Sequence, residues 1–103
     1  MKTGIELIAD ERKRQIEIEG WTEEHDAEHT NEALALAAVC YALPSSMREY
    51  IYNPLIKEIV PQFWPWPLEW WKPSPEDRIK ELKKSGAMIV AEIDRLLNAR
   101  KEE

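Results

Sequence analysis

The sequence is short of the residue types that several classes of functional site need. It has one cysteine, Cys40, so an internal disulfide and a cysteine-based zinc site are excluded. With three glycines it has no Gly-rich loop that would cradle phosphates. Its longest apolar run, residues 33–43, is far shorter than the roughly 20 residues that span a bilayer, and its first residues lack the apolar stretch of a signal peptide. We therefore expect a cytoplasmic protein.

An excess of positive charge is also missing. The net charge is −6, which argues against nonspecific nucleic-acid binding and against an anionic membrane surface as partners. A local cluster of cations can still oppose this global sign, so an anionic small molecule stays open as a ligand. The 103 residues suit one domain, 1–103, whose core is too small to enclose a cavity. A ligand site would then lie in a surface groove or between subunits.

Helical periodicity and capping patterns predict an all-α domain, a bundle of three to four helices. Thr3 and Glu6 form a capping box before a first helix over 4–19. The apolar side chains of this helix at helical spacing are Ile5, Ile8 and Ile16. A second helix, over 32–43, is apolar on every side, which is typical of a central or interface helix.

The second half of the chain predicts two more helices. One covers 46–60 and is broken at Asn53–Pro54, and no strand-type alternation stands out there. The other covers 75–99, with Ser74 as its cap and a proline at its first position. Its apolar residues form a heptad-like seam, made of Ile79, Leu82, Gly86, Ile89, Ile93 and Leu96. This seam and the all-apolar helix exceed what one small core buries, so we expect a homo-oligomer.

Residues 64–73 combine four of the five tryptophans with three prolines. Proline fixes φ and removes a backbone donor, so this segment is predicted to be a rigid loop. Its indoles either close a small core or stack on a planar ligand such as a nucleobase, with Lys72 or Arg78 available for a phosphate. The candidate ligand contacts here are Trp66, Trp70, Trp71 and Lys72.

Arg12 lies on the core-facing stripe of the first predicted helix. A buried guanidinium needs a partner, because an unpaired buried charge is very costly. That partner is either a carboxylate, such as Glu19 or an acid of the next loop, or the anionic group of a ligand.

The polar segment 21–31 carries both histidines. If it is helical, His25 and His29 share a face, the i,i+4 geometry that can bind a transition metal. The HExxH pattern is absent, however, because Asp26 follows His25, and further histidine or cysteine ligands are missing. The alternatives are an acidic helix cap or a metal-free ligand contact by these residues and Trp21. We expect no bound metal and no cofactor.

Helical pyrophosphohydrolases that act on nucleotides hold magnesium with paired ExxE and ExxD motifs. Here Glu28 and Glu32 are four residues apart, and Glu92 and Asp94 are two apart, so the ligand spacing does not fit. The predicted helical architecture and the acidity do agree with that class. Metal-dependent nucleotide hydrolysis therefore stays an alternative.

Several ordered motifs together resemble a family of small phage and prophage proteins, mostly of unassigned function. These motifs are ERxRQ at 11–15, EGWTxEHD at 19–26, the end of the alanine-rich helix at 40–42, WPW at 64–66 with WWKP at 70–73, and GAxIxAEIxR at 86–95. The resemblance implies a phage or prophage setting and, if the chain is phage-encoded, the host cytoplasm. A shorter set is similar to the ryanodine-receptor repeat, a small helical module: GWT at 20–22, Asp26 and His29, and Arg78 with Leu82 and Gly86. It favours a ligand-binding module over an enzyme.

We expect a noncatalytic phage protein that binds a small, nucleotide-derived molecule. By binding it, the protein would sequester a host-defence signal. The candidate site residues are Arg12, Trp21, His25, Asp26, His29, Trp66, Trp70, Trp71 and Lys72. The alternatives are the pyrophosphohydrolase and a protein-interaction module acting through Trp66, Trp70 and Trp71.

Overall fold

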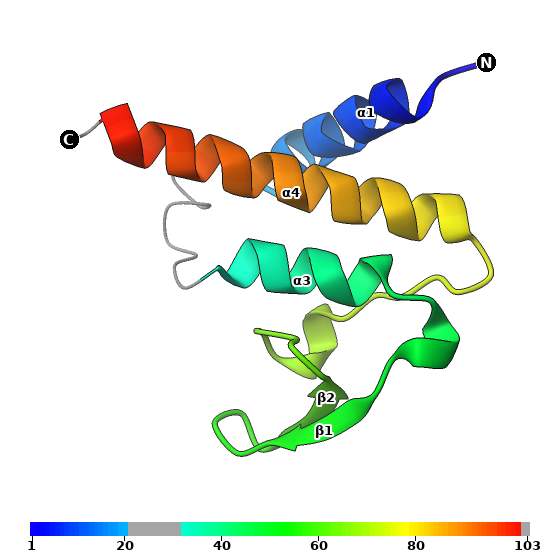
Figure 1. Ribbon diagram of the computed structural model, residues 1–103, viewed down its shortest axis with the longest axis vertical. Helices are drawn as coiled ribbons and strands as arrows, with labels where there is room; N and C mark the ends of the chain where they lie inside the picture. The colour runs from blue at the N-terminus through cyan, green and yellow to red at the C-terminus, as the bar shows by residue number, and fades with distance from the viewer. Residues whose placement is uncertain (21–31, 102–103) are drawn as a thin grey trace.

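The computed structural model describes residues 1–20 and 32–101. Its elements are α1 (Gly4–Glu17), α3 (Ala33–Ala42), the 3-10 turn η1 (Ser45–Met47), β1 (Tyr50–Asn53), β2 (Glu58–Pro61), the 3-10 turn η2 (Leu68–Trp70) and α4 (Arg78–Lys101) (Figure 1). The described part is therefore a mixed fold of helices and a two-stranded antiparallel sheet, and the prediction of an all-α bundle is wrong.

Helix α4 is the central element and runs across the molecule (Figure 1). It has 24 residues and contacts α3 on one side and α1 on the other. The β-hairpin lies beyond α3, on the side away from α4. Among the described helices, none combines the length and the apolar character that crossing a membrane requires.

The start of α1 confirms the predicted capping box. The Thr3 hydroxyl accepts the Glu6 backbone N–H at 3.3 Å, and the Glu6 carboxylate accepts the Thr3 backbone N–H at 3.0 Å. This reciprocal pair satisfies two backbone donors that the first turn leaves unpaired.

The face that α1 buries combines Ile8 with polar side chains, whereas Ile5 and Ile16 of the predicted apolar stripe are exposed. Its buried residues are Glu11, Arg12 and Gln15. Ile5 is 84% exposed, and Ile8 packs on Gly86 of α4, where a Cβ would lie 2.6 Å from the Ile8 side chain. The glycine thus lets α1 approach α4 closely.

The segment predicted as a broken helix over 46–60 is the hairpin β1–β2. Tyr50 pairs with Pro61 and Asn53 with Glu58, in antiparallel register. Asn53 makes the turn: its side-chain oxygen accepts the Leu55 N–H at 2.9 Å, and its carbonyl accepts the Lys57 N–H at 2.8 Å. An asparagine before a proline favours such a turn, and tyrosine, isoleucine and valine favour strands, so local chemistry agrees with the hairpin.

Helix α4 begins at Arg78, three residues later than predicted. The Asp77 carboxylate accepts the Lys80 backbone N–H at 3.1 Å, so Asp77 supplies the cap expected of Ser74. Ser74 instead donates its backbone N–H to the Glu81 carboxylate at 3.0 Å.

Two arginines hold the carboxyl end of α3, an arrangement we call the arginine clamp (Arg48, Arg78 and Glu81). Arg48 donates to the carbonyls of Cys40 and Tyr41 at 3.0 and 3.2 Å. Arg78 donates to three carbonyls, those of Tyr41, Ala42 and Leu43. The clamp therefore satisfies acceptors that the last turn of a helix leaves open.

Glu81 balances the charge of the clamp. Its carboxylate is 1% exposed and lies 3.0 Å from Arg48 and 3.1 Å from Arg78. Burial alone would raise the pKa of Glu81, but the Ser74 N–H and both arginines outweigh it and hold that pKa below its ordinary value. The buried carboxylate is therefore ionised at neutral pH.

Candidate functional site

The Trp/Pro segment folds its two most buried tryptophans against Tyr41 of α3. Trp64 and Trp71 are 3% and 8% exposed, and their rings lie 5.8 and 4.6 Å from the Tyr41 ring. The Trp71 indole N–H donates to the Tyr50 hydroxyl at 3.1 Å, and the Trp64 indole N–H donates to the Pro67 carbonyl at 3.1 Å. Because buried indole donors need partners, these bonds mark both residues as core.

Tyr41 connects this aromatic core to two lysines. Its hydroxyl accepts the backbone N–H of Lys72 at 3.0 Å, and the Lys84 ammonium lies 4.8 Å from its ring centre. Lys84 also donates to the Lys72 carbonyl at 3.3 Å. Burial raises the pKa of Tyr41 to about 12, so its hydroxyl stays protonated at neutral pH.

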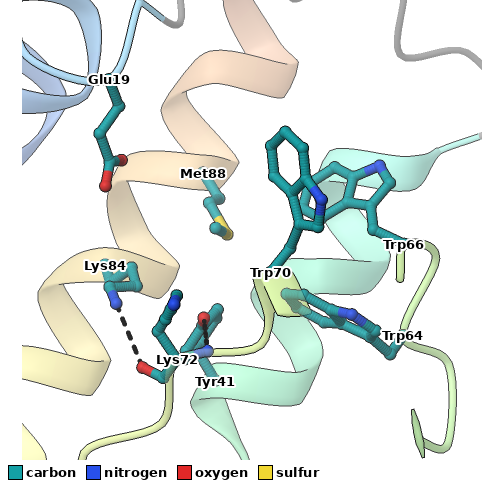
Figure 2. A pocket seen from close by; sticks show the side chains of 8 residues that line it. All are labelled: Glu19, Tyr41, Trp64, Trp66, Trp70, Lys72, Lys84 and Met88. Atoms are coloured by element: carbon teal, nitrogen blue, oxygen red, sulfur yellow. Dashed lines mark hydrogen bonds between the residues drawn. The ribbon is translucent and has the colours of Figure 1, made fainter. Parts of the chain in front are cut away.

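A small aromatic pocket opens at this junction (Figure 2). Its lining residues are Glu19, Tyr41, Trp64, Trp66, Trp70, Lys72, Lys84 and Met88. In Figure 2 the three indoles lie on one side of the pocket, and the charged groups of Glu19, Lys72 and Lys84 lie on the other. The pocket holds about 40 Å³, which is room for water but not for a planar ligand.

Two larger grooves adjoin the pocket and share Glu19 and Lys72 with it. The first, the Trp70 groove, holds about 500 Å³ and is lined by Glu19, Glu69, Trp70 and Lys72. The second, the lysine groove, holds about 450 Å³ and is lined by Glu11, Arg14, Glu19, Lys72, Asp77, Lys80, Lys83 and Lys84. Both volumes fall within the range of small-molecule sites.

The acids of the lysine groove are already engaged. Arg14 binds both oxygens of Glu11 at 2.8 Å and lies 3.4 Å from Glu19. Burial alone would raise the pKa of Glu11, but its hydrogen bonds and the Arg14 charge outweigh burial and lower it. Burial lowers the pKa of Lys84, although Glu11 and Glu19 oppose this shift. The groove thus keeps the Glu11 carboxylate ionised and paired with Arg14.

The structure brings together three of the predicted site residues and separates two. Trp66, Trp70 and Lys72 line the aromatic pocket, and Trp70 and Lys72 also line the Trp70 groove. Trp71 belongs to the core, and Arg12 is 7% exposed on α1; neither lines the pocket or the two grooves. The remaining predicted residues, Trp21, His25, Asp26 and His29, lie outside the described residues.

Sequence reasoning did not single out Tyr41, Trp64 or Lys84 as site residues. Tyr41 lies in the all-apolar helix and looks like any core residue there. Lys84 follows another lysine on α4, where a charged pair is typical of a solvated face. Their meeting depends on the packing of α3 against α4, for which the sequence has no local signal.

No protein-family model, curated protein or solved structure matches the chain. A functional conclusion therefore rests on the geometry of the grooves. Within residues 1–20 and 32–101, no three His, Cys, Asp or Glu side chains gather where they could hold a metal ion. The expectation about metal stays untested, because both histidines lie outside this part of the chain.

Proposed function

We propose that the protein binds, without transforming it, a small nucleotide-derived molecule whose planar part stacks on Trp70. The observation that carries this proposal is the Trp70 indole, which is 49% exposed in a groove that also presents Lys72. Stacking on an indole contributes about 1–3 kcal/mol per base. A hydrogen bond to a charged group adds about 1.5–3 kcal/mol.

The state of the buried carboxylates supports binding over catalysis. Glu11, Glu81 and Glu92 each accept hydrogen bonds from at least one arginine. The pKa values of Glu11 and Glu81 are lowered, whereas a general acid or base near neutral pH needs a raised carboxyl pKa. Glu11 and Glu81 are therefore suited to structural ion pairs and not to general acid or base catalysis.

The setting we propose is that of a phage or prophage protein in the host cytoplasm, where binding would sequester a signalling molecule. The support is the resemblance of the ordered sequence motifs, 11–15 through 86–95, to small phage proteins. A binding protein without chemistry suits that role, because sequestration needs affinity and abundance only.

The test is a thermal-shift screen of nucleosides, nucleotides and cyclic dinucleotides, followed by calorimetry on Trp70→Ala. We expect the variant to bind about tenfold to a hundredfold more weakly, because it loses the stacking surface. Its stability should change little, since the indole is half exposed.

Tyr52→Ala is the matched control, because Tyr52 is an aromatic residue 60% exposed on the hairpin. It should bind as the wild type does. A wild type that no compound in the screen stabilises would contradict the proposal, and so would equal affinity in Trp70→Ala.

A second function, binding to another protein chain, is favoured by the seam of α4. Its aliphatic residues are between 43% and 64% exposed, namely Ile79, Leu82, Ile89, Ile93 and Leu96. Exposed aliphatic side chains at heptad spacing are typical of a helix that pairs with a partner helix.

A further inference from the structure

The lysine groove concentrates positive charge in an acidic protein. Four of the eight lysines line it, although the net charge of the chain is −6. Five cations face three acids there, and Arg14 is held by Glu11 and Glu19. Asp77 is occupied as the cap of α4.

Among the described residues, three ammonium groups of this groove are available to a ligand. Within the part of the chain that the structure describes, Lys72, Lys80 and Lys83 have no carboxylate partner at ion-pair distance. Lys84 donates one hydrogen bond to the Lys72 carbonyl and retains two further donors. Unpaired like charges that lie side by side repel one another. An anion that binds among them relieves this repulsion, so anion binding is favoured.

The spacing of the lysines indicates an extended anion. Lys83 and Lys84 follow Lys80 by about one turn of α4, so the three lysines span about 6 Å of helix axis. Lys72 belongs to the loop before α4 and lines both the lysine groove and the Trp70 groove. A chain of phosphoryl groups can contact several of these ammonium groups at once, whereas one phosphate cannot reach all four.

We propose that the ligand of this site is a nucleoside di- or triphosphate, with its base on Trp70 and its phosphate chain along Lys72, Lys80, Lys83 and Lys84. The inference rests on the proposed function, because it places the base on the same indole. The added element is the polyphosphate chain of the ligand, which the four lysines of the groove select. Lysine binds phosphate as a point charge, so the groove selects charge and length, not a particular base.

The experiment is calorimetry in magnesium-free buffer with the four common nucleosides, their triphosphates and inorganic tripolyphosphate. We expect each triphosphate that binds to do so at least about tenfold more tightly than its nucleoside, because several charge-assisted contacts are added. The preference should fall as salt is raised, because salt screens the exposed ammonium groups.

The decisive variant is Lys80→Ala/Lys83→Ala, and its matched control is Lys2→Ala/Lys13→Ala, which removes the same charge from exposed positions of the N-terminal region. The groove variant should lose the preference for triphosphate and keep nucleoside affinity within about twofold of the wild type. The control should keep the preference. Alanine favours helix, so both variants are expected to fold, which circular dichroism checks.

The outcomes separate this inference from the proposed function. Nucleoside binding that the triphosphate does not improve would overturn the polyphosphate ligand and leave stacking on Trp70 intact. Tripolyphosphate binding that Trp70→Ala does not affect, with no nucleoside binding, would overturn both the nucleoside part and the proposed function.

Discussion

At the scale of single residues, Glu81 is the group on which the arginine clamp depends. Replacing it with glutamine leaves the buried Arg48 charge, whose side chain is 3% exposed, without a carboxylate. We expect Glu81→Gln to lower the free energy of unfolding by about 3–5 kcal/mol at pH 7, as measured by urea denaturation. Glu76→Gln, an exposed acid close by, should have little effect.

The difference in the free energy of unfolding between the wild type and Glu81→Gln should also depend on pH. The folded pKa of Glu81 lies below its ordinary value of 4.5, so the unfolded state binds more protons as pH falls. The difference between wild type and Glu81→Gln should be complete above pH 4.5 and shrink as pH falls below it. A difference that stays constant down to pH 3 would contradict the ionised clamp.

Trp71 and Trp70 are neighbours in sequence with opposite roles. Trp71→Ala removes a buried indole that packs on Tyr41 and Trp64, so we expect a loss of about 3–5 kcal/mol in the free energy of unfolding. Thermal unfolding of both alanine variants checks this contrast, since Trp70→Ala should unfold near the wild-type temperature. Equal stability of the two variants would mean that Trp71 is not part of the core.

At the scale of elements, the strong helical signals were predictable. The first, second and last helices appear as α1, α3 and α4, with ends displaced by at most three residues. Helix ends were less certain because they depend on which side chain takes the capping bond, as Asp77 does in place of Ser74.

The hairpin was not predicted because its strands are short and mostly exposed. Each strand has four residues. A strand is recognised in a sequence by a two-residue period, which arises when buried and exposed positions alternate, and β1 has no such alternation. In a helical segment the Asn53–Pro54 pair predicts a kink, whereas in the structure it makes a turn. At the site, the mostly irregular backbone of the Trp/Pro segment and the place of Lys72 beside it were predictable, whereas Tyr41 and Lys84 join them only through tertiary packing.

At the scale of the whole molecule, the described part has extents of 39 × 37 × 21 Å. In such a flattened body a long helix is covered on two sides by its neighbours and can keep a further side open. The seam of α4 lies on such an open side at Ile89 and Ile93, which are 48% and 50% exposed. We therefore propose that two copies of the chain associate through this seam.

Light scattering after size exclusion, at micromolar concentration, tests this association. The wild type should have the mass of a dimer or a higher closed oligomer, and Ile89→Glu/Ile93→Glu should be a monomer of unchanged helicity. Ile59→Glu is the control, because Ile59 is 61% exposed on the hairpin and should leave the mass unchanged. A monomeric wild type would show that the seam has no partner copy.

The arginine clamp also predicts which parts of the molecule open together. Arg48 precedes the hairpin and Arg78 begins α4, and both donate to the end of α3. Unfolding any one of these three parts uncovers carbonyls or a buried charge in the others, so they should open together as one cooperative unit. Helix α1 contributes no side chain to the clamp, and the residues that it buries are polar. Its amide protons should therefore exchange with solvent before those of α3, at a free energy below that of global unfolding.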